Sequence, residues 1–137
     1  MFKIYCVYLE KIHYNYKTIL NINPKGDTIL SIKYICGHLN SKLFSFYNSS
    51  TSNKIEAKDF PRLSVKDLKQ FPIREVDSSI PYKFEIQNLI ILLVKQIQTE
   101  LKLNPYENVK SFDSEIDKLV YELNGLTKEK IKIVECR

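Results

Sequence analysis

Two neighbouring segments decide the fold of this 137-residue chain: residues 34–47 read YICGHLNSKLFSFY, and residues 59–73 read DFPRLSVKDLKQFPI. The first segment predicts a helix, because apolar residues recur at helical spacing and can face a core together. These residues are Ile35, Leu39, Leu43 and Phe46. Lys42 and Ser45 are expected on the exposed side, and Thr28 or Ser31 is expected to begin the helix.

The second segment predicts a short helix from Val65 to Gln70. Ser64 is a good N-cap, and Asp67 lies three residues later, near the positive end of the helix dipole. Pro72 then forces the chain out of the helix. Between the two segments, residues 48–53 read NSSTSN, whose side chains compete for backbone hydrogen bonds and favour a loop.

The N-terminal residues predict a small β element. Residues 1–9 and 14–22 are rich in aromatic and β-branched residues and are interpreted as two strands, with the turn sequence NPKGD at residues 23–27 after the second. The expected fold class is therefore α+β, with this β element and an amphipathic helix followed by a long helix and a C-terminal helical pair. Residues 1–75 and 76–137 are expected to form two parts of one compact unit.

The second half predicts helices throughout. Pro81 suits a helix start, and a long helix is expected from Tyr82 to Leu103. This helix has an apolar stripe, and further apolar residues leave little of its middle polar. So much apolar surface predicts that the helix docks a partner. The docking residues are expected to be Ile86, Leu89, Ile90, Leu93, Ile97 and Leu101.

The last residues predict two further helices. Asp113 or Ser114 is expected to cap the first of them, Gly125 to supply a left-handed exit, and Thr127 to open the last helix. The inward-facing residues are expected to be Ile116, Leu119, Val120, Leu123, Ile131 and Val134.

The net charge of +5 is distributed unevenly. Residues 1–75 contain twelve Lys and Arg against six Asp and Glu, while residues 76–137 contain nine against ten. A basic half suits a polyanion, although lysine-rich faces are also common on proteins that bind no nucleic acid. The longest apolar run, Leu89 to Val94, is too short to span a membrane, and no signal-peptide pattern is visible, so we expect a cytoplasmic protein. Cys6, Cys36 and Cys136 are expected to be reduced thiols.

No catalytic centre is predicted. The sequence Asn104-Pro105-Tyr106 has part of a base-holding motif but is interpreted as a helix terminator, and Asp27 with Glu56–Lys58 makes a poor nuclease pattern. His13 and His38 have no metal-ligand neighbours in sequence, and His38 is expected to be partly exposed. We therefore expect no cofactor, no metal and no enzymatic activity in the isolated chain.

The residues Leu39–Lys42 and Pro61–Ile73 resemble the TaqI-like C-terminal specificity domain, the target-recognition part of type IIG restriction-modification enzymes that methylate adenine in DNA. The start of the long helix resembles the helix that docks the methyltransferase in type I specificity subunits. Residues 114–127 and 131–135 resemble the tail of the same enzymes, with Lys128 and Lys130 where the family usually has acids. The chain resembles the C-terminal portion of such a domain.

A DNA-binding role assigns different tasks to basic and amide side chains. Lysines act as point charges on phosphates, the fork of arginine suits guanine or phosphate, and amides can read adenine. The candidates are Lys42, Asn53, Lys54, Lys58, Arg62, Lys66, Lys69, Gln70 and Arg74. As alternatives, Arg74 bridges to Glu75 or Asp77, and Asn40 satisfies backbone groups nearby.

The expected function is a specificity fragment that binds double-stranded DNA and directs an adenine methyltransferase/endonuclease module. The alternative is a helical docking module or degenerate remnant that binds a methyltransferase or itself and not DNA. A homodimer is expected in either case, because the long helix has more apolar surface than one small domain covers.

Overall fold

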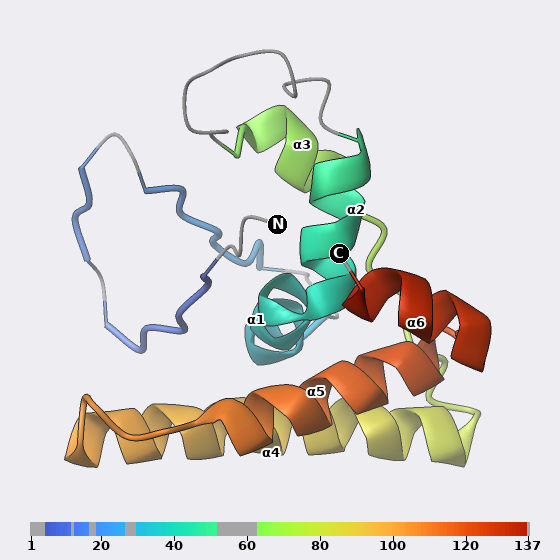
Figure 1. The fold of residues 1–137 in the computed structure, drawn as a ribbon. Coiled ribbons are helices and arrows are strands. Elements are labelled where there is room, and N and C mark those ends of the chain that lie inside the picture. Colours follow the sequence, from blue (N-terminus) through green and yellow to red (C-terminus); the bar gives the residue numbers. More distant parts are fainter. Residues whose placement is uncertain (1–4, 12, 17–18, 27–29, 52–62, 137) are drawn as a thin grey trace.

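The computed structural model describes residues 5–11, 13–16, 19–26, 30–51 and 63–136. These residues contain six helices and no strand (Figure 1). The helices are α1 (Ile32–Asn40), α2 (Lys42–Thr51), α3 (Val65–Gln70), α4 (Pro81–Leu103), α5 (Lys110–Leu123) and α6 (Lys128–Glu135). The α+β expectation was therefore wrong, and the described part of the chain is all-helical. No described helix is long and apolar enough to cross a membrane.

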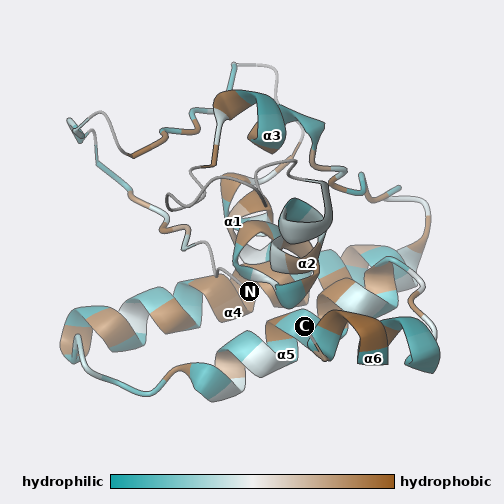
Figure 2. Cartoon of the chain, turned by 45° about the horizontal axis from the view of Figure 1, so that its top comes forward, coloured by the Kyte–Doolittle hydropathy of each residue, from teal (hydrophilic) through white to brown (hydrophobic). Residues whose placement is uncertain are grey.

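The helices form layers. Helices α4 and α5 lie side by side as a base, and α1 packs against both (Figures 1 and 2). Helix α2 continues from α1, with α6 beside its first turn and α3 near its far end (Figure 1). The α3 end of the molecule is thus separated from α4 by α1 and α2.

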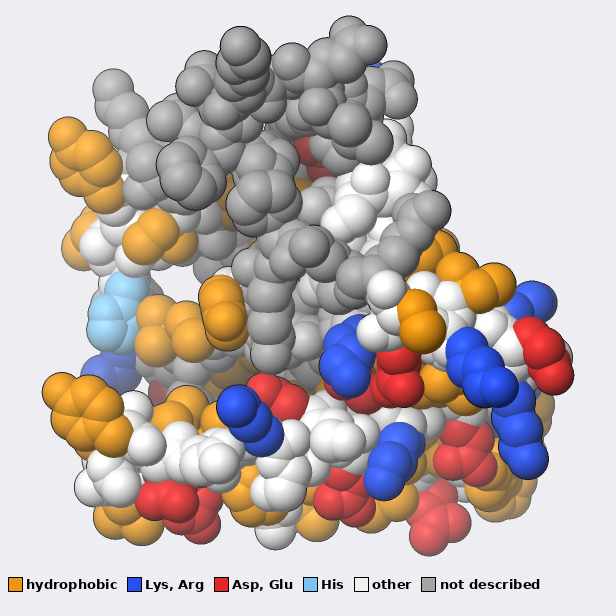
Figure 3. All heavy atoms as spheres, in the orientation of Figure 1, with side chains coloured by type: hydrophobic (Ala, Val, Ile, Leu, Met, Phe, Trp, Pro, Cys, Tyr) orange, Lys and Arg blue, Asp and Glu red, His pale blue; other side chains and the backbone are white. Residues whose placement is uncertain are grey.

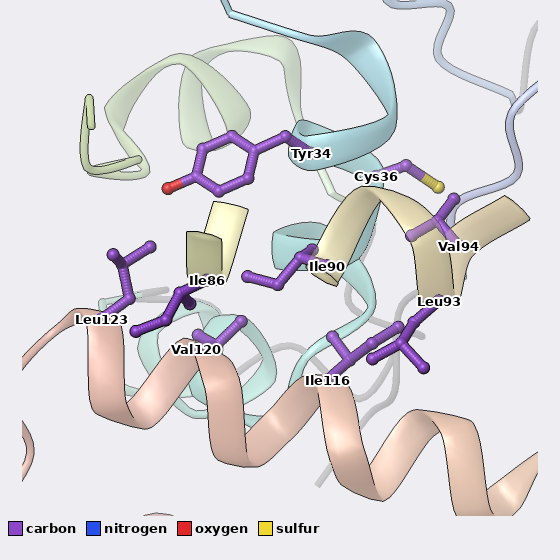
Figure 4. Packing of buried hydrophobic residues seen from close by; sticks show 9 residues of the cluster. All are labelled: Tyr34, Cys36, Ile86, Ile90, Leu93, Val94, Ile116, Val120 and Leu123. Atoms are coloured by element: carbon purple, nitrogen blue, oxygen red, sulfur yellow. The ribbon is translucent and has the colours of Figure 1, made fainter. Parts of the chain in front are cut away.

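The main core joins α1, α4 and α5 (Figure 4). Its buried side chains are Tyr34, Cys36, Ile86, Ile90, Leu93, Val94, Ile116, Val120 and Leu123. Gly37 is the point of closest approach, because a Cβ atom there would lie 2.6 Å from Cγ2 of Ile90. Glycine at this position lets α1 press its backbone against α4.

The predicted first helix breaks at Ser41, whose ψ of 153° is extended. The Ser41 hydroxyl donates to the His38 carbonyl at 2.6 Å and accepts from the Phe44 amide at 3.3 Å. The Lys42 amide donates to Oδ1 of Asp117 on α5 at 2.7 Å. These bonds satisfy the backbone groups exposed at the break, so two helices replace one.

The break changes which side chains of α2 face inward. Ser45 is buried rather than exposed, Phe44 is buried, and Leu43 and Phe46 are half-buried. Leu43 packs against the main core as predicted, but the exposed position predicted for Ser45 was wrong, because α2 starts with a new rotation about its axis.

Helix α2 also extends to Thr51, so the predicted loop was wrong for residues 48–51. The Ser49 hydroxyl donates to the Ser45 carbonyl at 2.8 Å, and the Thr51 hydroxyl donates to the Tyr47 carbonyl at 2.9 Å. Bonds to the carbonyl four residues earlier let hydroxyl side chains remain within a helix. Residues 52 and 53 lie outside the described residues.

The two predicted N-terminal strands are absent from the described residues 5–11, 13–16 and 19–22. Residues 5–9 alternate between exposed and half-buried, as in an extended chain. Their backbone is hydrogen-bonded by side chains of the helices and not, among the described residues, by a neighbouring strand. The Asn40 amide accepts from the Cys6 N–H at 2.8 Å and donates to the Cys6 carbonyl at 2.7 Å, and Gln98 donates to the Tyr8 carbonyl at 2.6 Å. β-Propensity describes how well a residue packs within a sheet. A segment with high β-propensity forms no sheet unless a neighbouring strand pairs with it.

Several local predictions are confirmed. Ser64 and Asp67 form a reciprocal capping box on α3, and Pro81 is the first residue of α4. Gly125 has a φ of 64°, and the Thr127 hydroxyl accepts from the Lys130 amide at the start of α6. The start of α5 was predicted wrongly, because it begins at Lys110 and places Asp113 in the first turn, where it faces the helix dipole favourably.

Candidate nucleic-acid interface

An aromatic cluster fixes α3 on α2. The ring of Phe71 lies 4.4 Å from that of Phe44 and 5.5 Å from that of Tyr47, both with edge-on geometry. The Tyr47 hydroxyl donates to the Gln70 carbonyl at 3.1 Å. These contacts hold the C-terminal end of α3, so its exposed side chains project from a defined support.

Helix α3 presents a polar, basic face to solvent. Lys66, Lys69 and Gln70 are exposed and follow one another at the i, i+3, i+4 spacing that places side chains on one face of a helix. Neither lysine forms an ion pair within the described part of the chain. Both ammonium groups are therefore free to meet an anion.

Arg74 lies four residues beyond α3, where the chain runs along Tyr34 of α1. Its side chain is exposed, while its backbone carbonyl accepts from the buried Tyr34 hydroxyl at 2.8 Å. Burial raises the pKa of Tyr34 to about 12, against a smaller opposite effect of the Arg74 cation, so the hydroxyl stays a donor. Among the described residues, Arg74 has no ion pair with Glu75 or Asp77, which leaves its guanidinium available.

The structure does not bring every predicted DNA-binding residue to this surface. Lys42 lies at the opposite end of α2, where its Nζ is 3.5 Å from Oε1 of Glu135 on α6. Four others lie outside the described residues: Asn53, Lys54, Lys58 and Arg62. The described candidate interface consists of Lys66, Lys69, Gln70 and Arg74, which we call the α3 surface.

The base of the molecule has a different character. Over α5 and α6, Lys and Arg side chains alternate with Asp and Glu (Figure 3). A surface of mixed sign has no long-range attraction for a polyanion comparable to that of a basic patch. The electrostatics therefore favour the α3 end for nucleic acid.

The predicted docking residues of α4 divide into three groups. Ile86, Ile90 and Leu93 are buried in the main core, where their side chains cannot reach a partner, and Leu89 is 41% exposed. Ile97 and Leu101 are half-buried. The exposed apolar residues of α4 thus lie mostly outside the predicted stripe.

The sequence Asn104-Pro105-Tyr106 is confirmed as a helix terminator. Asn104 ends α4, its amide donates to the Glu100 carbonyl at 2.9 Å, and Tyr106 is 95% exposed. Asp27 and Glu56–Lys58 lie outside the described residues. Within the described residues, no three His, Cys, Asp or Glu side chains form a metal-binding group.

His38 is buried, which corrects the expectation of a partly exposed residue. Its Nδ1 lies 3.1 Å from the Tyr34 carbonyl, and its buried Nε2 has no hydrogen-bond partner among the described residues. Burial lowers the pKa of His38, with the Tyr34 carbonyl acting weakly in the opposite direction. The imidazole is therefore a neutral core group in contact with the Tyr34 ring.

Sequence reasoning missed how the N-terminal segment is attached. All three cysteines are free thiols, but Cys6 and Cys36 are neighbours in space, and Sγ of Cys36 donates to the Cys6 carbonyl at 3.5 Å. Asn40 was expected to bond backbone groups nearby in sequence. Its side chain instead bonds the backbone N–H and carbonyl of Cys6, 34 residues away. Gly37 within a helical pattern could signal only the close approach of α4, so no local sequence signal predicted this attachment.

These features describe a small helical module with an exposed basic surface at one end. A family model for the TaqI-like C-terminal specificity domain matches residues 3–73, slightly more than half of the chain. The chain belongs to this family, which confirms the resemblance seen in the sequence. No curated protein and no solved structure matches it. Membership indicates DNA target recognition in restriction-modification systems, and a specificity domain is generally non-catalytic.

Proposed function

We propose that this chain recognises a DNA sequence through its α3 surface and thereby directs an adenine methyltransferase/endonuclease module. The observation that carries the proposal is the position of the α3 surface. It lies at the end of the segment that matches the specificity family, and its cations have no partners within the described chain.

The side chains of the α3 surface suit different parts of a duplex. Lys66 and Lys69 contact phosphates and supply affinity that falls with salt. Gln70 can pair with adenine through its amide, and Arg74 has the planar fork that binds guanine in two places. The exposed face of α3 thus combines two positioning lysines with Gln70, and Arg74 would add a second base-reading group from the following segment.

Catalysis belongs to the partner in this proposal. The methyltransferase/endonuclease module would supply the cofactor and the reacting groups, and this chain would supply the sequence preference in the cytoplasm, where such enzymes meet DNA. Lys42, close to α6, would then serve the contact between α2 and α6 through Glu135 rather than DNA.

Duplex binding measured at several salt concentrations tests the proposal. The two phosphate-contacting lysines of the α3 surface predict a slope of about −2 in a log-log plot of affinity against salt. Lys66→Ala and Lys69→Ala should each flatten that slope by about one unit. Lys118→Ala on α5 is the matched control, because Lys118 is an exposed lysine on the mixed-charge base.

The two lysine variants should lower affinity for all duplexes equally. A response of Lys118→Ala equal to theirs, or no duplex binding with and without a cognate methyltransferase, would contradict recognition through α3.

The exposed apolar residues of α4 favour a second candidate, a protein-docking module. Leu89 and Leu92 are 41% and 49% exposed in the middle of a long helix. Docking alone predicts that Leu92→Glu abolishes methyltransferase binding while the α3 variants change nothing. Loss of duplex binding in Lys66→Ala would exclude docking as the only function.

A further inference from the structure

The exposed side of α4 has a second repeat besides the one that faces the core. Seven positions recur at alternating spacings of three and four residues, which is the heptad spacing of a helix-pairing seam. They are Tyr82, Glu85, Leu89, Leu92, Gln96, Thr99 and Leu103, which we call the outer seam.

The outer seam points away from the rest of the molecule. Ile90 is 0% exposed and packs against α1 at Gly37, whereas Leu92 is 49% exposed. Two residues along a helix correspond to a rotation of about 200°, so Leu92 faces nearly opposite to Ile90. The apolar members of the seam are all open to solvent: Tyr82 at 56%, Leu89 at 41% and Leu103 at 79%.

We propose that the outer seam binds the outer seam of a second copy of this chain, with the two α4 helices antiparallel. We place the two-fold axis midway between Leu89 and Leu92. Leu89 of one copy then packs against Leu92 of the other copy. Glu85 then meets Gln96, and Tyr82 meets Thr99. Every layer repeats once on the other side of the two-fold axis, so the same patch serves both copies.

Charge selects the second copy and its orientation. In the antiparallel register, Glu85 lies beside Lys95 of the second copy, and the two-fold axis makes this pair twice. In a parallel pair, each seam residue meets its own copy, so Glu85 would oppose Glu85 in a desolvated seam, and like charges there are unfavourable. Neither Glu85 nor Lys95 forms an ion pair within the described chain, so both are available.

The dimer leaves both α3 surfaces free. Helices α1 and α2 stand between α4 and α3 (Figure 1), and the outer seam faces away from α1. Two-fold pairing through α4 therefore directs the two α3 ends outward. Self-association through α4 consequently does not depend on DNA binding.

Sedimentation of the full chain over a wide concentration range tests the proposal. The wild-type chain should sediment as a monomer–dimer equilibrium, and Leu92→Glu should raise the dissociation constant by about tenfold or more, because it places a charge in the centre of the seam. Ile133→Glu is the matched control, since Ile133 is an equally accessible apolar residue on α6, 55% exposed. Circular dichroism confirms that each variant is folded.

Glu85→Gln tests the orientation. It should weaken an antiparallel dimer, because Lys95 of the second copy loses its counter-charge, and it would strengthen a parallel dimer by removing a repulsion. Lys95→Glu should also weaken the dimer, and combining it with Glu85→Lys should restore association. A monomer at every concentration, an equal effect of Ile133→Glu, or tighter association in Glu85→Gln would overturn the proposal.

Discussion

The two halves of this chain reach the same core by different means. Helices α4 and α6 begin at signals in their own sequence, namely Pro81 for α4 and Thr127 for α6. Gly125, with its positive φ, makes the turn before α6. The first half depends on distant residues. Asp117 accepts from the first amide of α2, 75 residues earlier in the chain, and Asn40 holds the backbone of Cys6. The starts of α4 and α6 are thus specified locally, whereas the start of α2 and the attachment of the N-terminal segment depend on distant residues.

Truncation of the shared core should give the largest effect on stability. Ile90 is fully buried between α1 and α5, so Ile90→Ala should lower the free energy of unfolding by about 2 to 5 kcal/mol, measured by urea denaturation. Leu103→Ala is the control on the same helix, since Leu103 is 79% exposed and should change stability by less than about 0.5 kcal/mol. Equal losses in the two variants would show that α4 does not pack as described.

Removal of the Asn40 side chain should separate the N-terminal segment from the core. Asn40→Ala leaves the Cys6 N–H without its acceptor and the Cys6 carbonyl with only the weak donor Sγ of Cys36, and should cost about 1 to 3 kcal/mol. Hydrogen exchange should become faster at Cys6 and stay unchanged in α5. Unchanged protection at Cys6 would contradict the attachment through Asn40.

Asp117→Ala should show the dependence of α2 on the second half. The Lys42 amide loses its acceptor, with an expected cost of about 1 to 2 kcal/mol, typical of a lost helix cap. The measurement is thermal unfolding together with hydrogen exchange at the start of α2. Glu115→Ala, two residues earlier and exposed, should leave both unchanged, and an equal effect there would refute the capping role.

The buried His38 predicts a loss of stability in mild acid. Its pKa is lowered in the folded chain, so the unfolded chain binds the proton first, and folding is penalised once the pH falls below about 6.5. The slope should approach about 1.4 kcal/mol per pH unit until the pH reaches the folded pKa. His38→Phe, which keeps a ring beside Tyr34, should flatten the curve just below about pH 6.5. An identical slope in both proteins would show that His38 does not titrate there.

Sequence reasoning succeeded where the signals are local. The capping pair Ser64 and Asp67 fixed α3, and that helix register places Lys66, Lys69 and Gln70 on one face, so much of the α3 surface was predictable. The sequence motifs at Leu39–Lys42 and Pro61–Ile73 also identified the protein family correctly.

Three of the failures share a physical cause, which is dependence on contacts between distant segments. The break at Ser41 requires Asp117, and the burial of His38 follows from the new helix directions. The composition of residues 5–9 predicted a strand in a sheet. Their backbone is instead hydrogen-bonded by the side chains of Asn40 on α1 and Gln98 on α4. Periodicity and propensity describe one segment at a time and do not contain this information.

Selection of binding sites from a randomised duplex pool tests the central claim most directly, namely that the α3 surface reads DNA sequence. The wild-type chain, alone or with an adenine methyltransferase, should enrich one sequence. Arg74→Ala should lower affinity for that sequence by about 1 to 3 kcal/mol and relax the preference at one position, because arginine reads a single base pair. Lys66→Ala should weaken all sequences without changing the enriched one. No enriched sequence in either condition, or an Arg74→Ala profile identical to that of Lys118→Ala, would contradict the claim.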